Sequence, residues 1–313
     1  MEGGNQSRVS EFILLGLSEQ PEQERIRFLL FLFMYLISGL GNLLIMMAIY
    51  SDPHLHTPMY FFLSNLSLVD ICFTSTTVPR MLNNYVSKNR TIQYAECLTQ
   101  VFFLLCFAGM DCVLLAIMAY DRYVAICAPL HYNTVMTPKV CARLVAVSWF
   151  WACNNALTNA LFLTRLSFCG HNEIPNFFCD LSPLLKLACS DTFINDMLIY
   201  TMGALTTFLP FIGILISYIH IFMAVLKISS VSGKQKVFST CGSHLTVVCL
   251  FYGTIIGVYF SPTSTHTAQQ DIAATVMYTM VTPMLNPFIY SLRNKDMKGA
   301  LRMLITRRPG FTL

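Results

Sequence analysis

Charged residues are scarce in this sequence, and their scarcity excludes an ordinary soluble domain. Only 12% of the residues are Asp, Glu, Lys or Arg, whereas 55% are hydrophobic; soluble domains average about 25% charged residues. The polar first 25 residues contain no apolar core of a signal peptide, so we expect the first apolar segment to direct insertion itself. The chain also shows no internal repeat and no series of short alternating strands, which disfavours repeat-built transporters and membrane β-barrels.

The sequence instead contains several long apolar runs. A membrane-spanning helix needs about 20 mostly apolar residues. Seven runs reach this length: residues 26–50, 58–80, 98–120, 142–163, 197–226, 237–260 and 272–292. We therefore expect an all-α membrane protein, a seven-transmembrane helix bundle over residues 26–292 with an N-terminal tail of residues 1–25. Residues 293–313 should form a short amphipathic helix and tail on the membrane surface.

Basic residues predict the orientation of this bundle. Seven spans place the two termini on opposite sides, and the C-terminal side carries twelve of the 20 Lys and Arg residues. The positive-inside rule then places the N-terminus outside the cell and the C-terminus in the cytoplasm. The net charge of +4 becomes a cytoplasmic surface suited to anionic lipid and an acidic partner, rather than to nucleic acid.

Short motifs predict two modifications on the outer side. Asn5-Gln6-Ser7 is an N-glycosylation acceptor, so we expect a glycan on Asn5. An even set of cysteines in an oxidising compartment predicts disulfides. Four cysteines allow three pairings, among which the spacing does not choose. The four are Cys97, Cys169, Cys179 and Cys189.

The third apolar run ends in a charged pair. Asp121 and Arg122 lie side by side within Met118–Cys127, which reads MAYDRYVAIC. A charged pair at the end of a membrane helix is energetically costly unless it has a function or contacts water. Taken alone, the pair is equally compatible with an interfacial anchor in which Arg122 extends to the lipid headgroups.

Three further strings make the pattern specific. They are Leu55–Ser64 (LHTPMYFFLS), Lys236–Leu245 (KVFSTCGSHL) and Pro283–Tyr290 (PMLNPFIY). Together with the third-run string they resemble the signatures of olfactory receptors, a branch of the rhodopsin-like G-protein-coupled receptors. Thr57 before the proline resembles the larger, tetrapod-expanded class of these receptors, whereas Val237 departs from the usual Ala.

The resemblance implies a function and a set of switch residues. It implies a plasma-membrane receptor that binds small neutral volatile molecules within the bundle and activates a stimulatory heterotrimeric G protein, raising cyclic AMP, with no required cofactor. It also implies the disulfides Cys97–Cys179 and Cys169–Cys189. The residues expected to couple the receptor to the G protein are Asp121, Arg122, Tyr123, Tyr218, Ser239, His244, Asn286, Pro287 and Tyr290.

Two acidic residues lie inside the second and third runs. No Lys or Arg lies in the middle of any run to neutralise Asp70 and Asp111. One interpretation is two protonated acids in a polar packing network, because charge within the membrane is expensive. The other is a cation between them, since the resemblance implies a sodium ion at Asp70 and an added acid at Asp111.

A ligand cavity can be outlined from residues that share helix faces. For any single residue, ordinary packing is the simpler explanation. The resemblance places the cavity of this family among the third, fifth, sixth and seventh helices. Apart from Asp111, we expect no acid or base around it, which favours a neutral ligand. The candidates are Leu104, Leu105, Ala108, Gly109, Asn155, Asn159, Met202, Thr206, Tyr252, Ile256, Tyr259 and Thr279.

Two other classes of function compete with a receptor. A transporter or channel predicts discontinuous spans or a charged pathway, for which only Asp70 and Asp111 offer support. An intramembrane enzyme predicts a nucleophile beside a base or a metal cluster, and no such arrangement emerges from the sequence.

Overall fold

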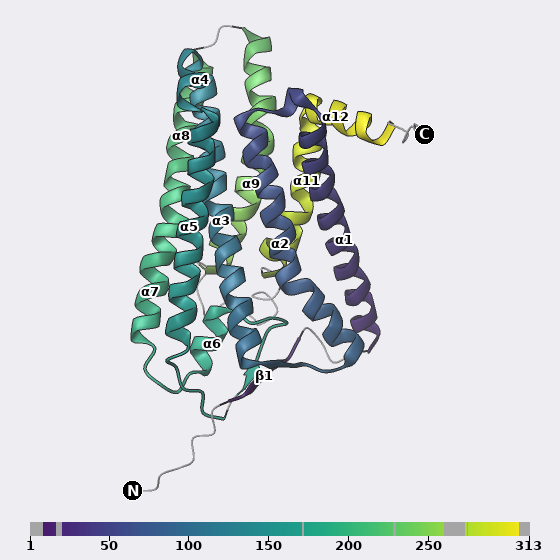
Figure 1. Cartoon of the computed structure of the whole chain (residues 1–313), viewed down its shortest axis with the longest axis vertical. Coiled ribbons are helices and arrows are strands. Elements are labelled where there is room, and N and C mark those ends of the chain that lie inside the picture. The colour runs from purple at the N-terminus through teal and green to yellow at the C-terminus, as the bar shows by residue number, and fades with distance from the viewer. Residues whose placement is uncertain are drawn as a thin grey trace, which may run out of the picture.

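A computed structural model describes residues 9–16, 21–170, 172–227, 230–259, 273 and 275–306. The chain folds into an elongated bundle of helices that run roughly along one common axis (Figure 1). Helical segments overlap all seven predicted runs. The long helices are α1 (Pro21–Ser51), α2 (Pro58–Ser87), α3 (Tyr94–Cys127), α5 (Pro138–Leu163), α7 (Phe193–Gly203), α8 (Leu209–Leu226), α9 (Val231–Tyr259) and α11 (Thr282–Arg293).

Several helices extend beyond the apolar runs that predicted them. Helix α1 begins at Pro21 rather than at residue 26, and α2 continues to Ser87 rather than to residue 80. Helical hydrogen bonding does not stop where the apolar character stops, so these ends continue into the polar border of the bundle. Among the described residues, four segments are long and apolar enough to cross a membrane: Glu24–Ser51, Pro58–Ser87, Tyr94–Cys127 and Phe193–Leu226.

One end of the bundle, which we call the sheet end, carries a small sheet that the sequence did not predict. Its strands are β1 (Glu11–Leu14), β2 (Thr91–Gln93) and β3 (Glu173–Ile174), in the order β2-β1-β3. Strand β1 pairs antiparallel to β2 and parallel to β3. The short helix α6 (Leu181–Leu187) lies at the same end (Figure 1). Residues 11–14, ahead of α1, therefore pair with two later loops.

The opposite end, which we call the α12 end, carries two short elements outside the bundle. Helix α4 (Tyr132–Val135) lies between α3 and α5, and α12 (Lys295–Thr306) runs across the bundle axis (Figure 1). Met297 and Ala300 of α12 are buried, whereas Asp296 and Lys298 are exposed. This pattern confirms the predicted amphipathic C-terminal helix. The 3₁₀ turns η1 (Pro53–Leu55) and η2 (Pro129–His131) complete the loops.

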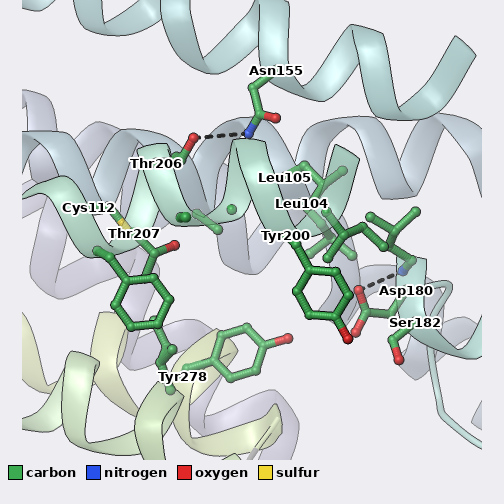
Figure 2. A pocket seen from close by; sticks show the side chains of 18 of the residues that line it. Leu104, Leu105, Cys112, Asn155, Asp180, Ser182, Tyr200, Thr206, Thr207 and Tyr278 are labelled. Atoms are coloured by element: carbon green, nitrogen blue, oxygen red, sulfur yellow. Dashed lines mark hydrogen bonds between the residues drawn. The ribbon is translucent and has the colours of Figure 1, made fainter. Parts of the chain in front are cut away.

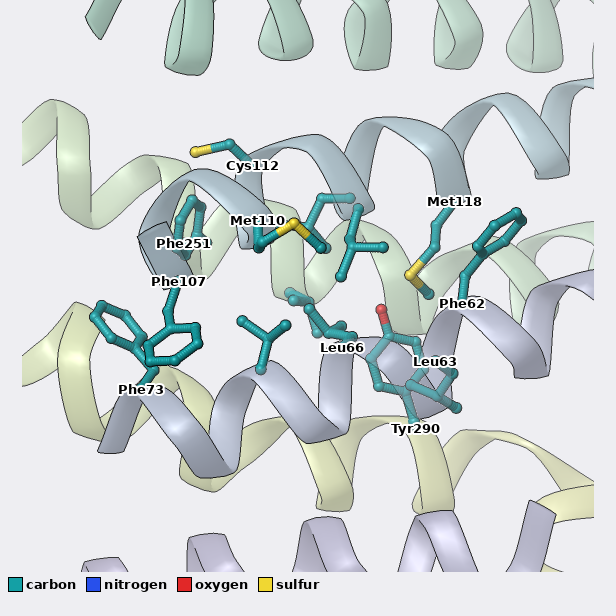
Figure 3. Packing of buried hydrophobic residues seen from close by; sticks show 14 of the residues in the cluster. Phe62, Leu63, Leu66, Phe73, Phe107, Met110, Cys112, Met118, Phe251 and Tyr290 are labelled. Carbon is teal, nitrogen blue, oxygen red and sulfur yellow. The ribbon is translucent and has the colours of Figure 1, made fainter. Parts of the chain in front are cut away.

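The core of the bundle lies where α2, α3, α9 and α11 meet. Leu66, Phe73, Met110 and Tyr290 are almost completely buried and belong to one large apolar cluster (Figure 3). The outward surface is apolar as well: Ile212, Ile216 and Ile219 of α8, among others, are at least half exposed. Apolar side chains on both the inner and outer faces are typical of helices that contact lipid.

Two helices widen by one residue just before a proline. The π-turn η3 (Ala204–Phe208) precedes Leu209-Pro210, and η5 (Met277–Val281) precedes Thr282-Pro283. A proline has no N–H and its ring collides with the carbonyl four residues earlier, which belongs here to Thr206 and Thr279. In each case the residue before the proline bonds five residues back, from Leu209 N to Ala204 O and from Thr282 N to Met277 O.

Both predicted disulfides are confirmed. Cys97 at the start of α3 is bonded to Cys179 in the loop before α6, and Cys169 is bonded to Cys189 within the same long loop. The first bridge ties the loop to the bundle across 82 residues of sequence, and the second closes a segment of 20. Together they hold this loop and α6 over the sheet end.

Candidate functional site

A cavity of about 800 Å³ lies inside the bundle toward the sheet end. Helix α3 contributes one wall, the η3 turn and α8 a second, and α9 with Tyr278 of η5 a third (Figure 2). Helix α6 and the start of α7 close it from the sheet end through Leu181, Leu185 and Thr192. A volume of this size suits one small organic molecule.

Seven of the twelve predicted ligand residues line this cavity: Leu104, Leu105, Ala108, Gly109, Asn155, Thr206 and Tyr252. The described lining does not include three others. Asn159 is buried and bonds to Asn155, Thr279 is buried and donates to Thr275 O, and Met202 lies on α7. The side chains of Ile256 and Tyr259 lie outside the described residues.

The expectation of no acid or base around the cavity was wrong. Asp180, Lys186 and Asp196 all line it, at the end closed by α6 and α7. The Asp180 carboxylate accepts a hydrogen bond from Leu181 N at 2.7 Å, and Asp196 accepts one from Thr192 Oγ1 at 2.9 Å. Burial raises the pKa of the Asp180 carboxyl, which favours its neutral form relative to an exposed aspartate.

The sequence held a signal for Asp180 that was not used. Asp180 directly follows Cys179, and Cys179 is bonded to Cys97 at the top of α3. A residue next to such a bridge must lie over the bundle, close to the mouth of any cavity beside α3. Lys186 of α6 and Asp196 of α7 line the same end of the cavity.

The polar side of the cavity is a chain of hydrogen bonds from α5 to the η3 turn. Trp151 Nε1 donates to Thr206 Oγ1 at 3.2 Å, and Asn155 Nδ2 donates to the same oxygen at 3.3 Å (Figure 2 shows the second bond). Asn159 Nδ2 in turn donates to Asn155 Oδ1 at 3.0 Å. Trp151 was not predicted as part of the site.

The two acids predicted as a cation site lie at the side of the cavity that faces the α12 end. Asp70 is 1% exposed, and its Oδ2 accepts a hydrogen bond of 2.8 Å from Asn286 Nδ2. Asp111 is 4% exposed, and its Oδ1 has no hydrogen-bond partner among the described residues. The two carboxyl groups interact electrostatically. No cluster of three or more His, Cys, Asp or Glu side chains suited to a metal ion occurs in the described part of the chain.

At the α12 end, Asp121 is shared between two partners. Its Oδ2 lies 3.6 Å from Arg122 Nη2, and its Oδ1 accepts a hydrogen bond of 2.8 Å from the Tyr132 hydroxyl of α4. Asp121 is almost completely buried, whereas 13% of the Arg122 side chain is exposed. The Tyr123 ring packs against the His220 ring of α8, with the two ring centroids 5.6 Å apart. The role of Tyr132 was not predicted.

A second group of predicted switch residues links three helices. His244 of α9 bonds to the Tyr218 hydroxyl of α8 at 2.8 Å and to Leu115 O of α3 at 3.0 Å. Because a carbonyl oxygen only accepts, Nε2 is the donor to Leu115, and in a neutral ring Nδ1 accepts from Tyr218. The Tyr290 hydroxyl is buried without a hydrogen-bond partner among the described residues.

Pro287, the predicted switch proline of α11, lies against α1. A Cβ atom at Gly41 of α1 would come within 2.9 Å of the Pro287 side chain, and Asn42 Nδ2 donates to Pro283 O at 3.1 Å. Two predicted residues are not placed by the structure: Asn5 and the side chain of Ser239 lie outside the described residues.

Comparison with known proteins supports the arrangement described above. A family model described as "Olfactory receptor" matches residues 31–308. The chain is 61% identical to olfactory receptor 1f45 of Rattus norvegicus over 98% of both chains, and 58% identical to olfactory receptor 1F1 of Homo sapiens over 98% of both. Its fold resembles that of squid rhodopsin with a TM-score of 0.70, at 18% identity, over 92% of this chain and 87% of that one.

Proposed function

Because this chain belongs to the olfactory receptor family of multi-pass membrane proteins, we propose that it is an odorant receptor coupled to a stimulatory heterotrimeric G protein. A small neutral volatile molecule binds in the cavity, and the activated G protein raises cyclic AMP. The observation that carries this proposal is the cavity itself. Its volume of about 800 Å³ suits one small molecule, and its walls are largely aliphatic and aromatic.

The arrangement of the walls explains how binding would reach the G protein. The cavity is lined by α3, α8 and α9, and the same helices carry Arg122, Tyr218 and His244 nearer the α12 end. A ligand that fits one arrangement of these helices better than another shifts the equilibrium between them. Activation would move Arg122 away from Asp121 toward the G protein, while Tyr218 and Tyr290 help to hold the active arrangement.

A neutral ligand remains the best match despite the charged groups at the mouth. Lys186 is exposed and faces solvent, and Asp180 and Asp196 already accept hydrogen bonds from Leu181 and Thr192. The deeper walls, by contrast, consist of residues such as Leu104, Phe251 and Tyr252. An ionised ligand would lose its hydration there without gaining a partner of opposite charge.

The proposed function includes an orientation in the plasma membrane. The sheet end faces outward, so odorants enter beside α6, and the tail of residues 1–25 carries a glycan on Asn5. Residues 26–292 form the membrane-embedded receptor. Residues 293–313 lie on the cytoplasmic side, where α12 places its buried Met297 side toward the bundle and its basic residues near anionic lipid.

We further propose that Asp70 and Asp111 can hold a sodium ion, although the receptor requires no cofactor. The fit rests on Asp111 Oδ1, a buried carboxylate oxygen that no described side chain satisfies. Oxygen ligands suit a hard cation. Two protonated acids in a packing network are the competing explanation, and they would need no ion.

The function is tested in cells that express the receptor, a stimulatory G protein and a cyclic AMP reporter. A chemically diverse panel of neutral odorants is expected to include agonists that raise cyclic AMP. Arg122→Ala should abolish this response at equal surface expression, because Arg122 is the proposed contact to the G protein. Arg143→Ala, at an exposed arginine near the same end, is the matched control and should respond normally.

The competing functions give different results in the same cells. A channel or transporter would produce an odorant-dependent ion flux that does not require the G protein. A full cyclic AMP response in the Arg122→Ala receptor would contradict the assigned coupling role.

A further inference from the structure

The cavity is covered at the sheet end by α6, a helix that is too short to be stable by itself. It has seven residues, whereas isolated helices shorter than about 12–15 residues are marginal in water. Leu181 and Leu185 of α6 line the cavity, and both also belong to an apolar cluster that is separate from the bundle core. The packing of this second cluster therefore determines how firmly α6 covers the cavity.

Strand β1 contributes two large side chains to this second cluster. Side chains alternate along a strand, so Phe12 and Leu14 point to one side and Ile13 to the other. Phe12 and Leu14 are 0% and 2% exposed. The strand is held in place between β2 and β3, at the same end of the bundle as α6 (Figure 1). The cluster, which we call the sheet-end cluster, includes Phe12, Leu14, Ile92, Phe168, Leu181 and Leu185.

A chain of contacts leads from Phe12 to the C-terminal end of α6. The Phe12 ring meets the Phe168 ring edge-on, with the two centroids 5.2 Å apart. Phe168 forms an antiparallel bridge with Ala188, and Ala188 N donates to Leu185 O in the last turn of α6 at 3.2 Å. The Cys97–Cys179 bridge adjoins the opposite, N-terminal end of α6. Phe12 thus supports the end of α6 that lies farther along the chain from this bridge.

We propose that Phe12 is a positioning residue for the cover of the cavity, so that the N-terminal strand limits how readily molecules enter and leave. Phe12 is not among the described residues of the cavity lining, so it acts through α6. A closed and a loosened cover are two states in equilibrium. Weakening the packing of the closed state raises the population of the loosened one. The effect on odorants rests on the proposed function, whereas the effect on access to the cavity does not.

The first experiment measures access to the cavity without an odorant or a G protein. Ala108 of α3 lines the cavity, so Ala108→Cys places a reporter thiol there. The purified receptor in lipid nanodiscs is treated with a quaternary-ammonium methanethiosulfonate, and mass spectrometry gives the labelling rate at residue 108. Adding Phe12→Ala should raise this rate roughly tenfold or more, which corresponds to about 1.4 kcal/mol. Removing a buried aromatic side chain usually costs more than this.

The controls separate a loosened cover from a loosened receptor. Ile13→Ala alters the same strand on its opposite face, outside the sheet-end cluster, and should leave the rate unchanged. Phe12→Leu keeps an apolar side chain in the cluster and should give an intermediate rate, which decides the question if Phe12→Ala expresses poorly. The native thiols of Cys141 and Cys241 are buried near the α12 end, and their labelling should stay the same.

The second experiment measures the release of an odorant. Cells that express equal surface amounts of each receptor are exposed to an agonist from the odorant panel, which is then washed out. The cyclic AMP signal should decline faster with Phe12→Ala than with Ile13→Ala, because a loosened cover lets the ligand leave more readily.

The two readouts distinguish this inference from the proposed function. Equal labelling at residue 108 in the Phe12→Ala and Ile13→Ala receptors would overturn the role of Phe12, and so would an equal rise in labelling at Cys141 and Cys241. Faster labelling at residue 108 in a receptor that answers no odorant with cyclic AMP would contradict the proposed function and leave the role of Phe12 intact. Faster labelling with an unchanged decline after washout would overturn the claim that the cover limits odorant release.

Discussion

The Asp121 carboxylate contacts two side chains, the Tyr132 hydroxyl and the Arg122 guanidinium, at different distances. The Tyr132 hydroxyl lies 2.8 Å from Asp121, within ordinary hydrogen-bond distance, whereas the Arg122 guanidinium lies 3.6 Å away. A hydrogen bond to a charged group is worth about 1.5–3 kcal/mol. The bond from α4 therefore holds the buried Asp121 carboxyl in addition to Arg122, so Asp121 keeps one partner when Arg122 moves away.

This difference predicts the effect of removing the Tyr132 hydroxyl. Tyr132→Phe should leave the buried Asp121 with Arg122 as its main partner and loosen the contact between α3 and α4. We expect the basal balance between inactive and active receptor to shift by roughly tenfold, the equivalent of about 1.4 kcal/mol. The measurement is basal cyclic AMP, normalised to surface expression, with Tyr120→Phe as a control on an exposed neighbouring tyrosine. Basal activity equal to wild type would show that this contact does not set the balance.

At the same scale, the sequence predicted some cavity residues and missed others for a physical reason. Leu105, Gly109, Asn155 and Thr206 could be found because residues four apart lie on one helix face. Trp151 lies four residues before Asn155 in α5, so the same spacing, extended by one turn, would have included it. Spacing does not show that the Trp151 and Asn155 side chains both donate to Thr206 Oγ1.

At the scale of elements, prolines shaped the helices more than the apolar runs indicated. Pro210 and Pro283 lie inside two of the predicted apolar runs, and the widened turns η3 and η5 before them were not predicted. A proline removes a hydrogen bond, but whether the helix then kinks, ends or widens depends on the packing of neighbouring helices. The sequence therefore fixes the position of such a distortion and leaves its form to the tertiary structure.

Helix α1 packs so closely against α11 that one added methyl group on α1 is expected to destabilise the bundle. At Gly41, a Cβ atom would lie 2.9 Å from Pro287 Cβ, too close for a stiff proline ring to adjust. Gly41→Ala should push α1 from α11 and destabilise the bundle by about 1–3 kcal/mol, the usual cost of overpacking. Gly39→Ala is the matched control, because no described residue of another helix lies within 4 Å of the added Cβ atom.

The measurement for this pair is the thermal midpoint of purified receptor, together with surface expression. Gly39→Ala should match or slightly exceed wild type, since alanine favours a helix more than glycine does. Equal midpoints for the two variants would mean that α11 moves away from α1 freely.

At the scale of the whole molecule, the sequence predicted the helical bundle better than its covered end. Length and hydropathy suffice for membrane helices, because each satisfies its backbone hydrogen bonds internally. The small sheet instead pairs Phe12 with Ile92 and Leu14 with Ile174, residues distant in sequence. No local pattern specifies such pairings. Asp180 at the mouth of the cavity was missed for a different reason: helical spacing covers only the spans, whereas Asp180 is placed by the adjacent Cys97–Cys179 bridge.

Asp70 and Asp111, on the α12 side of the cavity, lie where three helices of the bundle meet. Asp70 belongs to α2, Asp111 to α3, and Asn286, which donates to Asp70, to α11. A cation held by the two carboxylates would link these helices, and it would favour whichever arrangement of the bundle keeps them close. A ligand that binds only the folded state at ten times its dissociation constant stabilises that state by about 1.4 kcal/mol.

We therefore expect sodium to raise the thermal midpoint of the purified receptor relative to potassium at equal ionic strength, which controls for general screening. Asp111→Asn should remove this sodium dependence, because it removes the carboxylate whose Oδ1 has no described partner. Glu96→Gln, which alters an exposed carboxylate on the same helix, should retain it.

If both acids are protonated members of a packing network, the midpoint will be the same in both salts. Asp111→Asn will then be tolerated, because an amide can replace a neutral carboxylic acid of nearly the same shape. The salt comparison thus decides between the two interpretations of these acids without requiring an odorant or a G protein.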